Sequence, residues 1–337
     1  MRGRSRIVNR WSLALIVVLC GALIVSSLSA VERDSRATGS ELRATARLAT
    51  PTSCATGSGP YYPAYDPVDH DVYVPNFDSG SISVFNGSCH LVGTVTLPSG
   101  ASPEAAAFDP ANNGVYVTDS GLDHIYVIRG LTISNTMSGP RITDPVSIVW
   151  DPGDAVMIVT NSYAGDDVLV ISGTTVIGTV PVGLFPQGLC YDPFYNQVLV
   201  VNYGDDNVTI LNGYEPLGPA LANLPVGFDP YYCAFDVADN SDYVTNFGDD
   251  NVSVITGQIV VGSVNVGSLP MGIAWDQSNL RIYVVDYGSG DLSLISGMSV
   301  VKTVVTHVSA PEGIVLNEVT NMMYLDSFSN DKVYLES

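Results

Sequence analysis

The sequence has little positive charge. Its 337 residues include 34 Asp and Glu but only 13 Lys and Arg, and four of those 13 lie in the first ten residues. The remainder therefore carries nine basic side chains against all 34 acidic ones. A chain this acidic repels phosphate backbones and lacks the basic stripe that binds a polyanion. The composition argues against nucleic acid as a partner, whereas cations are attracted to such a surface.

Histidines and catalytic motifs are also scarce. The four histidines are His70, His90, His124 and His307, and the sequence has no CxxCH, HExxH or GxSxG motif. These motifs would mark a haem attachment site, a zinc protease and a serine hydrolase, respectively. We therefore expect no catalytic residue, no metal site and no cofactor.

The first thirty residues differ from the rest. Four arginines lie within residues 1–10, and the uncharged apolar run that follows at 11–29 is about as long as a bilayer-spanning helix. Because basic residues tend to stay inside, we expect 1–10 to be a basic cytoplasmic tail, 11–29 a transmembrane signal-anchor and 30–41 a linker. The small residues near Ala30 also suit a peptidase, which would make the segment a cleaved signal peptide. Either way, the rest of the chain is expected outside the cytoplasm, at the cell membrane or secreted.

The chain is rich, by contrast, in an internal repeat. Seven tetrapeptides resemble YVTN, which occurs literally at 243–246. An Asp or Asn stands seven residues before each copy, and a Pro stands six residues before that Asp or Asn. The copies begin at residues 73, 116, 158, 199, 243, 283 and 324. The period of 40 to 44 residues matches one four-stranded blade of a β-propeller.

Each repeat contains four strand-like runs separated by turns, and no helical period occurs after residue 30. We expect an all-β fold over 42–337, a seven-bladed β-propeller of four-stranded antiparallel blades, preceded by one N-terminal transmembrane helix or signal segment. The last repeat stops after its third strand. We expect residues 43–50 to supply the missing strand, because this exchange closes the ring and leaves no free sheet edge.

The literal YVTN at 243–246 and its six near copies resemble the YVTN-repeat β-propellers, a family that includes archaeal surface-layer proteins and YncE-like bacterial proteins. The resemblance covers about residues 42–337 and is specific for the fold. For function it implies an exported, non-enzymatic surface or envelope protein. YncE-like members have been linked to DNA, but the acidic composition argues against that partner here.

Acidic turns connect the second and third strands of successive repeats. GDDN occurs at 204–207 and 248–251, and Gly, Asp and Asn supply the positive φ that tight hairpins need. Nothing like a calcium-binding loop is present, so we interpret these carboxylates as turn residues on a wet face. Three Asn-x-Ser/Thr sequons also fall at predicted turns and are candidate glycosylation sites, although turn geometry alone favours Asn there. They are Asn86, Asn207 and Asn251.

The residues that follow each repeat's proline differ between copies. They begin the innermost strand, at the mouth of the central channel, where a ligand would bind. Four tyrosines and two glutamates there would suit sugars or cationic groups by stacking and cation–π contact; alternatively, they only plug the channel. The candidate ligand-binding residues are Tyr61, Tyr62, Glu104, Gln187, Tyr231, Tyr232 and Glu312.

Five cysteines are too few for a disulfide framework in a chain of this length. Cys54 and Cys89 are a candidate pair in an oxidising compartment. Cys190 and Cys233 occupy repeat positions that differ by one residue, and other repeats fill those positions with small apolar side chains. Their thiols are therefore expected on opposite sides of their strands, and we expect no bridge between them.

Together these features indicate an exported cell-surface or envelope-associated propeller that acts as a non-enzymatic binding or structural module. It would be attached to the membrane through its N-terminal helix and would bind cell-surface glycans, proteins or cations. Two alternatives stay open. One is an exported propeller enzyme of lactonase or lyase type, and the other is a surface-layer subunit.

Overall fold

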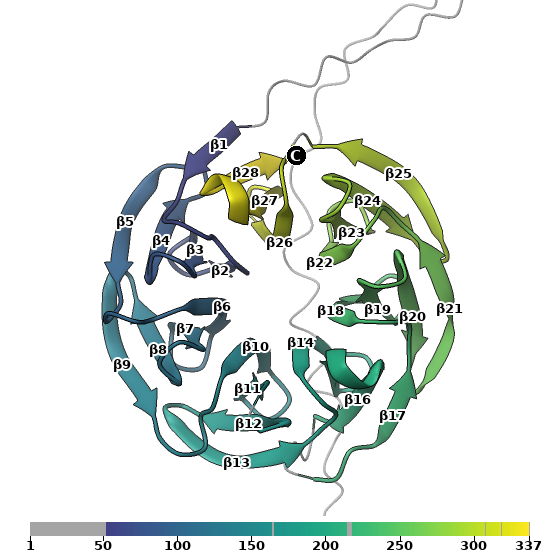
Figure 1. Cartoon of the computed structure of the whole chain (residues 1–337), viewed down its shortest axis with the longest axis horizontal. Coiled ribbons are helices and arrows are strands. Elements are labelled where there is room, and N and C mark those ends of the chain that lie inside the picture. The colour runs from purple at the N-terminus through teal and green to yellow at the C-terminus, as the bar shows by residue number, and fades with distance from the viewer. Residues whose placement is uncertain (1–51, 164, 214–217, 307, 318, 337) are drawn as a thin grey trace, which may run out of the picture. The chain divides into compact units, whose positions relative to one another are not determined.

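The computed structural model describes residues 52–337 except 164, 214–217, 307, 318 and 337. Seven four-stranded antiparallel sheets stand around a central axis like the blades of a propeller (Figure 1). Short 3₁₀ turns at Tyr203–Asp205 (η1) and Phe328–Asn330 (η2) complete the described structure. The prediction of an all-β, seven-bladed propeller is therefore confirmed.

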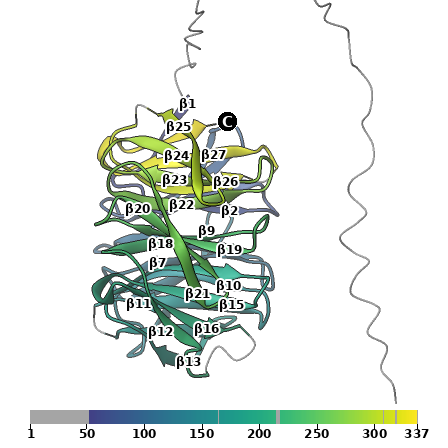
Figure 2. The same cartoon turned by 90° about the vertical axis from the view of Figure 1, so that its right-hand side faces the viewer.

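The strands of blades one to six run in chain order from the centre to the perimeter, whereas in blade seven the outermost strand is β1. In the side view β21 lies in front of the other strands of its blade (Figure 2). Blade one has β2 (Ala64–Asp66), β3 (Asp71–Asn76), β4 (Ser81–Asn86) and β5 (Leu91–Thr96). Blade two has β6 (Pro103–Asp109), β7 (Gly114–Asp119), β8 (His124–Arg129) and β9 (Thr132–Ser138). Blade three has β10 (Pro145–Asp151), β11 (Val156–Asn161), β12 (Asp167–Ser172) and β13 (Thr175–Pro181).

The remaining blades follow the same plan. Blade four has β14 (Pro186–Asp192), β15 (Gln197–Asn202), β16 (Asn207–Asn212) and β17 (Ala222–Pro225). Blade five has β18 (Pro230–Asp236), β19 (Ser241–Asn246), β20 (Asn251–Thr256) and β21 (Ile259–Asn265). Blade six has β22 (Pro270–Asp276), β23 (Arg281–Asp286), β24 (Asp291–Ser296) and β25 (Ser299–Val305). Blade seven has β26 (Pro311–Asn317), β27 (Met322–Ser327), β28 (Lys332–Glu336) and β1 (Thr52–Ala55).

Blade seven is built from both ends of the propeller, as the repeat predicts, but from a different N-terminal segment. Strand β1 pairs with β28 from Thr52↔Leu335 to Ala55↔Lys332, so the closing strand is Thr52–Ala55 and not residues 43–50. The spacing explains this position, because Ala55 precedes its proline by five residues, as Asn265 at the end of β21 does. Residues 43–50 and the expected segments 1–10, 11–29 and 30–41 lie outside the described residues.

The described part of the chain contains no helix with the length and apolarity needed to cross a bilayer.

The threonine of the tetrapeptide holds the innermost strand in place. The register between β6 and β7 shifts between Pro103 and Ala106, which marks a β-bulge. Thr118 Oγ1 accepts the Ala105 N–H at 3.0 Å and donates to the Val146 carbonyl of the next blade at 2.7 Å. Thr160 and Thr245 make the same two contacts in their blades. In these three blades the threonine therefore fixes the bulge that follows the proline.

The acidic hairpins join neighbouring blades. Asp166, Asp206 and Asp250 have positive φ values of 47°, 52° and 52°, as their turns require. Their Oδ1 atoms accept backbone N–H groups from the loops that lead into the next blade, at 3.0, 3.0 and 2.8 Å, respectively. These carboxylates are therefore occupied by the scaffold.

Two disulfides are present in the described structure. Cys54–Cys89, with its Cα atoms 5.7 Å apart, ties the closing strand β1 to the β4–β5 turn of blade one. Cys190–Cys233, with its Cα atoms 5.6 Å apart, joins β14 of blade four to β18 of blade five. The expectation of no bridge there was wrong. Neighbouring blades pack front to back, so thiols on opposite faces of adjacent blades point toward each other.

Candidate functional site

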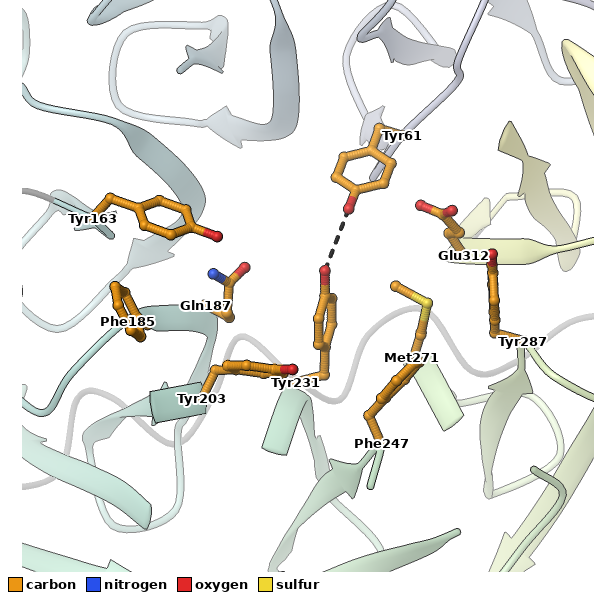
Figure 3. A pocket seen from close by; sticks show the side chains of 10 residues that line it. All are labelled: Tyr61, Tyr163, Phe185, Gln187, Tyr203, Tyr231, Phe247, Met271, Tyr287 and Glu312. Atoms are coloured by element: carbon orange, nitrogen blue, oxygen red, sulfur yellow. Dashed lines mark hydrogen bonds between the residues drawn. The ribbon is translucent and has the colours of Figure 1, made fainter. Parts of the chain in front are cut away.

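A cavity opens at the channel mouth, above the starts of the innermost strands. It has two adjoining lobes of about 460 and 420 Å³, which share Tyr61, Tyr163, Gln187, Tyr231 and Glu312 (Figure 3). The first lobe is also lined by Phe185, Tyr203, Phe247, Met271 and Tyr287. The second is also lined by Phe77, Glu104, Ser120, Asp144, Val146 and Phe328. The size suits a small organic ligand, because such pockets commonly enclose several hundred Å³.

Two tyrosine pairs close the channel beneath this cavity. The hydroxyl groups of Tyr61 and Tyr231, from blades one and five, meet across the channel at 3.4 Å (Figure 3). The rings of Tyr62 and Tyr232 stack with centroids 4.0 Å apart and belong to the buried core. Of the seven candidate residues, Tyr61, Glu104, Gln187, Tyr231 and Glu312 therefore face the cavity, and Tyr62 and Tyr232 plug the channel. Their role in ligand binding stays a prediction.

A second set of aromatic side chains surrounds the mouth, and the sequence analysis missed it. These residues directly follow the tetrapeptide, where the chain enters the 2–3 hairpin, except in blade three, where the aromatic comes one residue later. They are Phe77, Tyr163, Tyr203, Phe247, Tyr287 and Phe328. The signal was available, since five of the seven repeats have Phe or Tyr at that position. It was overlooked because we interpreted those hairpins as turns spaced around the rim.

These rings touch the tyrosines of the floor. The Tyr203 ring stands nearly perpendicular to that of Tyr231, at 88°, with the centroids 6.0 Å apart. Tyr61 contacts Phe77 and Phe328 at centroid distances of 6.1 and 6.0 Å. Edge-to-face contacts of this kind fix ring positions, so the mouth presents a preformed apolar wall.

Glu312 is a buried carboxyl group in this wall. Its side chain is only 7% exposed, and burial, together with the nearby Asp326 carboxyl, raises its pKa to about 8. Asp326 stands where blades two, three and five have the tetrapeptide's threonine, and its Oδ1 accepts the Gly313 N–H at 2.9 Å, as the threonine would. Its Oδ2 is buried without a hydrogen-bond partner, and burial raises its pKa to about 7. At neutral pH Glu312 is therefore mostly protonated.

Glu104 supplies a second perturbed carboxyl group, from the blade on the other side of Tyr61. Burial raises its pKa to about 7, the Ser120 hydroxyl opposes this rise, and Asp144 and Asp119 add to it. Burial also raises the pKa of Tyr231 to about 12, so its hydroxyl stays protonated as a hydrogen-bond donor. The mouth thus combines two carboxyl groups that titrate near neutrality with phenolic donors, which is a set suited to acid–base chemistry.

The other candidate residues lie away from this cavity. Asn207 and Asn251 are half-buried at the starts of β16 and β20, and their Oδ1 atoms accept from Asn202 and Asn246 at 2.7 Å. Asn86 is half-buried at the end of β4, and its Oδ1 accepts the N–H groups of Ser88 and His90. These bonds build turns, and glycosylation at the three sites stays a prediction.

Histidines do not contribute to the mouth in the part of the chain that the structure describes. His70 and His90 are exposed and His124 lies beside Tyr126, whereas His307 is outside the described residues. Among described residues, no group of three or more His, Cys, Asp or Glu side chains is arranged to hold a metal ion.

Comparison with protein-family models and with curated proteins finds no match to this sequence. Solved structures do match in fold. Virginiamycin B lyase from Staphylococcus aureus, in a catalytically inactive variant that replaces a histidine with alanine and with quinupristin present, has a TM-score of 0.74 at 13% identity. The match covers 84% of this chain and 97% of that one. A streptogramin B lyase has a TM-score of 0.73 at 14% identity, over 85% of this chain and 95% of that one.

A third match is Kuenenia stuttgartiensis hydrazine synthase, with a TM-score of 0.70 at 15% identity, over 88% of this chain and 99% of that one. At such identities the likeness establishes the seven-bladed propeller fold alone. A chain of the Mitotic Checkpoint Complex also matches, with a TM-score of 0.73 at 13% identity. The three neighbours described above are nevertheless enzymes by name, and two of them are lyases. This finding contradicts our expectation of a non-enzymatic module and favours the lyase alternative, which the two mouth glutamates support chemically.

Proposed function

We propose that the propeller is an exported enzyme of lyase type and that its active site is the channel mouth. The observation that carries this proposal is the pair Glu104 and Glu312, two carboxyl groups whose pKa values of about 7 and 8 lie near neutrality in an aromatic cavity. The likeness to virginiamycin B lyase and streptogramin B lyase supports the choice of reaction.

A lyase that breaks a C–O bond needs one proton acceptor and one proton donor. The base removes a proton from the carbon next to a carbonyl, and that electron pair forms the new C=C bond. The leaving oxygen departs with the C–O pair and takes a proton from the acid. Glu104 is partly ionised at neutral pH and suits the base, whereas Glu312 is mostly protonated and suits the acid.

The tyrosine pair on the floor can stabilise the charge that develops. When one hydroxyl of Tyr61 and Tyr231 donates to the other, the accepting hydroxyl keeps its own hydrogen to donate to a substrate carbonyl. The surrounding rings of Tyr203, Phe247 and Tyr287 would hold an aromatic or apolar part of the substrate. No histidine lines this mouth among described residues, so the acid–base work falls to the glutamates.

Quinupristin and virginiamycin B, named with the similar structures, are the first substrates to assay. Elimination opens a cyclic ester without changing its mass, whereas hydrolysis adds the mass of one water. We expect a ring-opened product of unchanged mass from the wild-type chain, and none from a Glu104→Gln, Glu312→Gln double variant. Glu336→Gln, the same change on strand β28 and outside the cavity, is the matched control and should retain turnover. An intact substrate, or a product heavier by one water, would contradict the lyase assignment.

Export is part of the same proposal. The arginines of residues 1–10 and the apolar run at 11–29 support it, and two disulfides suit an oxidising compartment. We also propose that the chain is a divergent relative of the YVTN-repeat propellers, on the strength of its seven tetrapeptides. Cell fractionation of the full chain tests the location, and recovery of the propeller in the cytoplasm would contradict export.

A further inference from the structure

Blade five places a carboxylate where the other blades have a buried apolar side chain. The residue before each tetrapeptide is Val, Met or Ile in six repeats, and none of these six is more than 3% exposed. In blade five it is Asp242, which is 0% exposed and has no hydrogen-bond partner on either Oδ1 or Oδ2. The six apolar equivalents are Val72, Val115, Met157, Val198, Ile282 and Met323.

Blade four lacks a tyrosine that blades two and five present to the next blade. In blades two and five the first residue of the tetrapeptide is a tyrosine that reaches the next blade: Tyr116 donates to the Gly173 carbonyl at 2.6 Å and Tyr243 to the Gly297 carbonyl at 3.1 Å. In blade four this residue is Leu199. Leucine is shorter than tyrosine and has no hydroxyl, so it makes no hydrogen bond to the next blade.

Asp192 and Gln197 of blade four each have a side-chain oxygen without a hydrogen-bond partner. In blade two the equivalent Asp109 Oδ2 accepts from Asn112, whose amide also contacts the Tyr116 hydroxyl. In blade four Asp192 uses Oδ1 to cap its own turn, while its Oδ2 has no partner. Gln197 Oε1 also has none, and the two residues are 0% and 6% exposed.

Asp192, Gln197 and Asp242 face one another across the interface between blades four and five. Asp192 pairs with Gln197 in the sheet, so both side chains share one face, and Asp192 lies two residues from Cys190, which is disulfide-bonded across that interface. Asp242 lies two residues from Val244, which packs in the same cluster as both disulfide cysteines. Asp192 is also the strongest charge acting on Asp242.

Four buried acceptor oxygens therefore converge here: Asp192 Oδ2, Asp242 Oδ1, Asp242 Oδ2 and Gln197 Oε1. None of them is a donor when the carboxyls are ionised, and one shared proton cannot satisfy all four. A hard divalent cation satisfies them together and balances two negative charges. We propose that blades four and five hold a calcium ion between Asp192, Asp242 and Gln197, as a structural site apart from the channel mouth.

The test compares the disulfide-bonded propeller with a variant that restores the residue of the neighbouring blades, Asp242→Val. After loading with CaCl₂ and dialysis into metal-free buffer, we expect elemental analysis to give one calcium per wild-type chain. EDTA should lower the wild-type Tm, and CaCl₂ should restore it. Asp242→Val should hold no calcium and should melt at one temperature with or without EDTA.

Asp286→Asn is the matched control. It also replaces a fully buried carboxylate by the side chain that four other repeats have, and it should bind calcium like the wild type. If Asp242→Val fails to fold, Gln197→Met replaces it in the test. This variant removes only the neutral ligand and should weaken calcium binding severalfold. A wild-type chain without bound calcium and with an EDTA-insensitive Tm would overturn the proposal. Undiminished calcium binding by Asp242→Val, or by Gln197→Met in its place, would overturn it as well.

Discussion

The carboxyl groups of the acidic hairpins and those of the channel mouth have different surroundings. In the hairpins, Asp166, Asp206 and Asp250 recur at one repeat position, and each accepts a backbone N–H from the next inter-blade loop. At the mouth, Glu104 and Glu312 follow their prolines in only two blades, and burial raises the pKa of both. The recurring hairpin carboxylates are satisfied by the scaffold, whereas the two mouth carboxyl groups are free to react.

This difference identifies where function lies in a repeat protein. A residue that every blade needs for its turn or its bulge is repeated because each blade solves the same folding problem. A carboxyl group that only two blades carry, and whose ionised form is destabilised by burial, has no such explanation. Substitutions in the two groups of carboxyls should therefore differ in solution, with large effects on turnover at the mouth and effects only on stability in the hairpins.

The largest expected effect is on turnover at the mouth. Glu104→Gln and Glu312→Gln should each lower kcat by about 10²–10⁴-fold, the range typical of a lost general base or acid. For the wild type, activity should be greatest between pH 7 and pH 8, because Glu104 must be ionised and Glu312 protonated. Residual activity of Glu104→Gln should lose the acidic limb of the pH profile, and that of Glu312→Gln the alkaline limb. Unchanged profiles in both variants would refute these roles.

The next effect is on stability through Asp326, which stands where three other blades have threonine. Its pKa is raised to about 7 in the folded chain, so ionising it costs stability as the pH rises from about 4 through 7. Asp326→Thr should remove this loss, which is at most about 4 kcal/mol. Urea unfolding at pH 4.5 and pH 8 should show a gain for the variant at pH 8 only.

The same variant also probes catalysis, because the charge of Asp326 contributes to the raised pKa of Glu312. The alkaline limb of the activity profile should therefore move to lower pH in Asp326→Thr. A purely structural role for Asp326 would change the unfolding curves and leave that limb in place.

A smaller effect is expected in the hairpins. Asp250→Ala removes the acceptor for the Leu269 N–H and places alanine at a φ of 52°, so it should destabilise the chain by about 1–2 kcal/mol. Asp250→Asn keeps an acceptor and tolerates this φ, and it should stay within about 0.5 kcal/mol of the wild type. Both variants should retain turnover at the mouth. If Asp250→Asn lost activity while its stability stayed unchanged, the claim that the hairpin carboxylates serve only the scaffold would be wrong.

The smallest effect is expected from the aromatic wall. Phe247→Leu removes a ring that contacts Tyr231 and Tyr287 at centroid distances of 6.1 and 6.4 Å. Because such contacts are worth about 0.5–1.5 kcal/mol, KM should rise by up to about tenfold while kcat changes little. Phe194→Leu, at an exposed ring outside the cavity, is the control and should leave both constants unchanged.

The seven blades could be predicted from the sequence because each blade corresponds to one copy of the repeat. The proline, the Asp or Asn and the tetrapeptide recur at fixed intervals, and each corresponds to a bulge, a turn or a strand in the structure. The disulfide between blades four and five could not be predicted, because the repeat does not show which faces of neighbouring blades pack together. Cys190 and Cys233 were placed on opposite faces of their strands, and the bridge forms because the front of one blade packs against the back of the next.

Prediction of the site was similarly incomplete. The position after each proline was correctly placed at the mouth, but nothing in the repeat showed that Tyr62 and Tyr232 stack below it. The aromatic ring after the tetrapeptide was visible in the sequence as a repeated Phe or Tyr. The raised pKa of Glu312 could not be read from the sequence, because it depends on burial and on Asp326, which lies 14 residues further along the chain.

The central claim is that Glu104 and Glu312 titrate near neutrality. Labelling with [δ-¹³C]glutamate gives at most seven carboxyl signals, one for each glutamate of the sequence, and Glu104→Gln and Glu312→Gln assign two of them. A ¹³C NMR titration should place these two pKa values at about 7 and about 8. If both signals titrate near the ordinary glutamate value of about 4.3, the mouth holds no acid–base pair and the account is wrong.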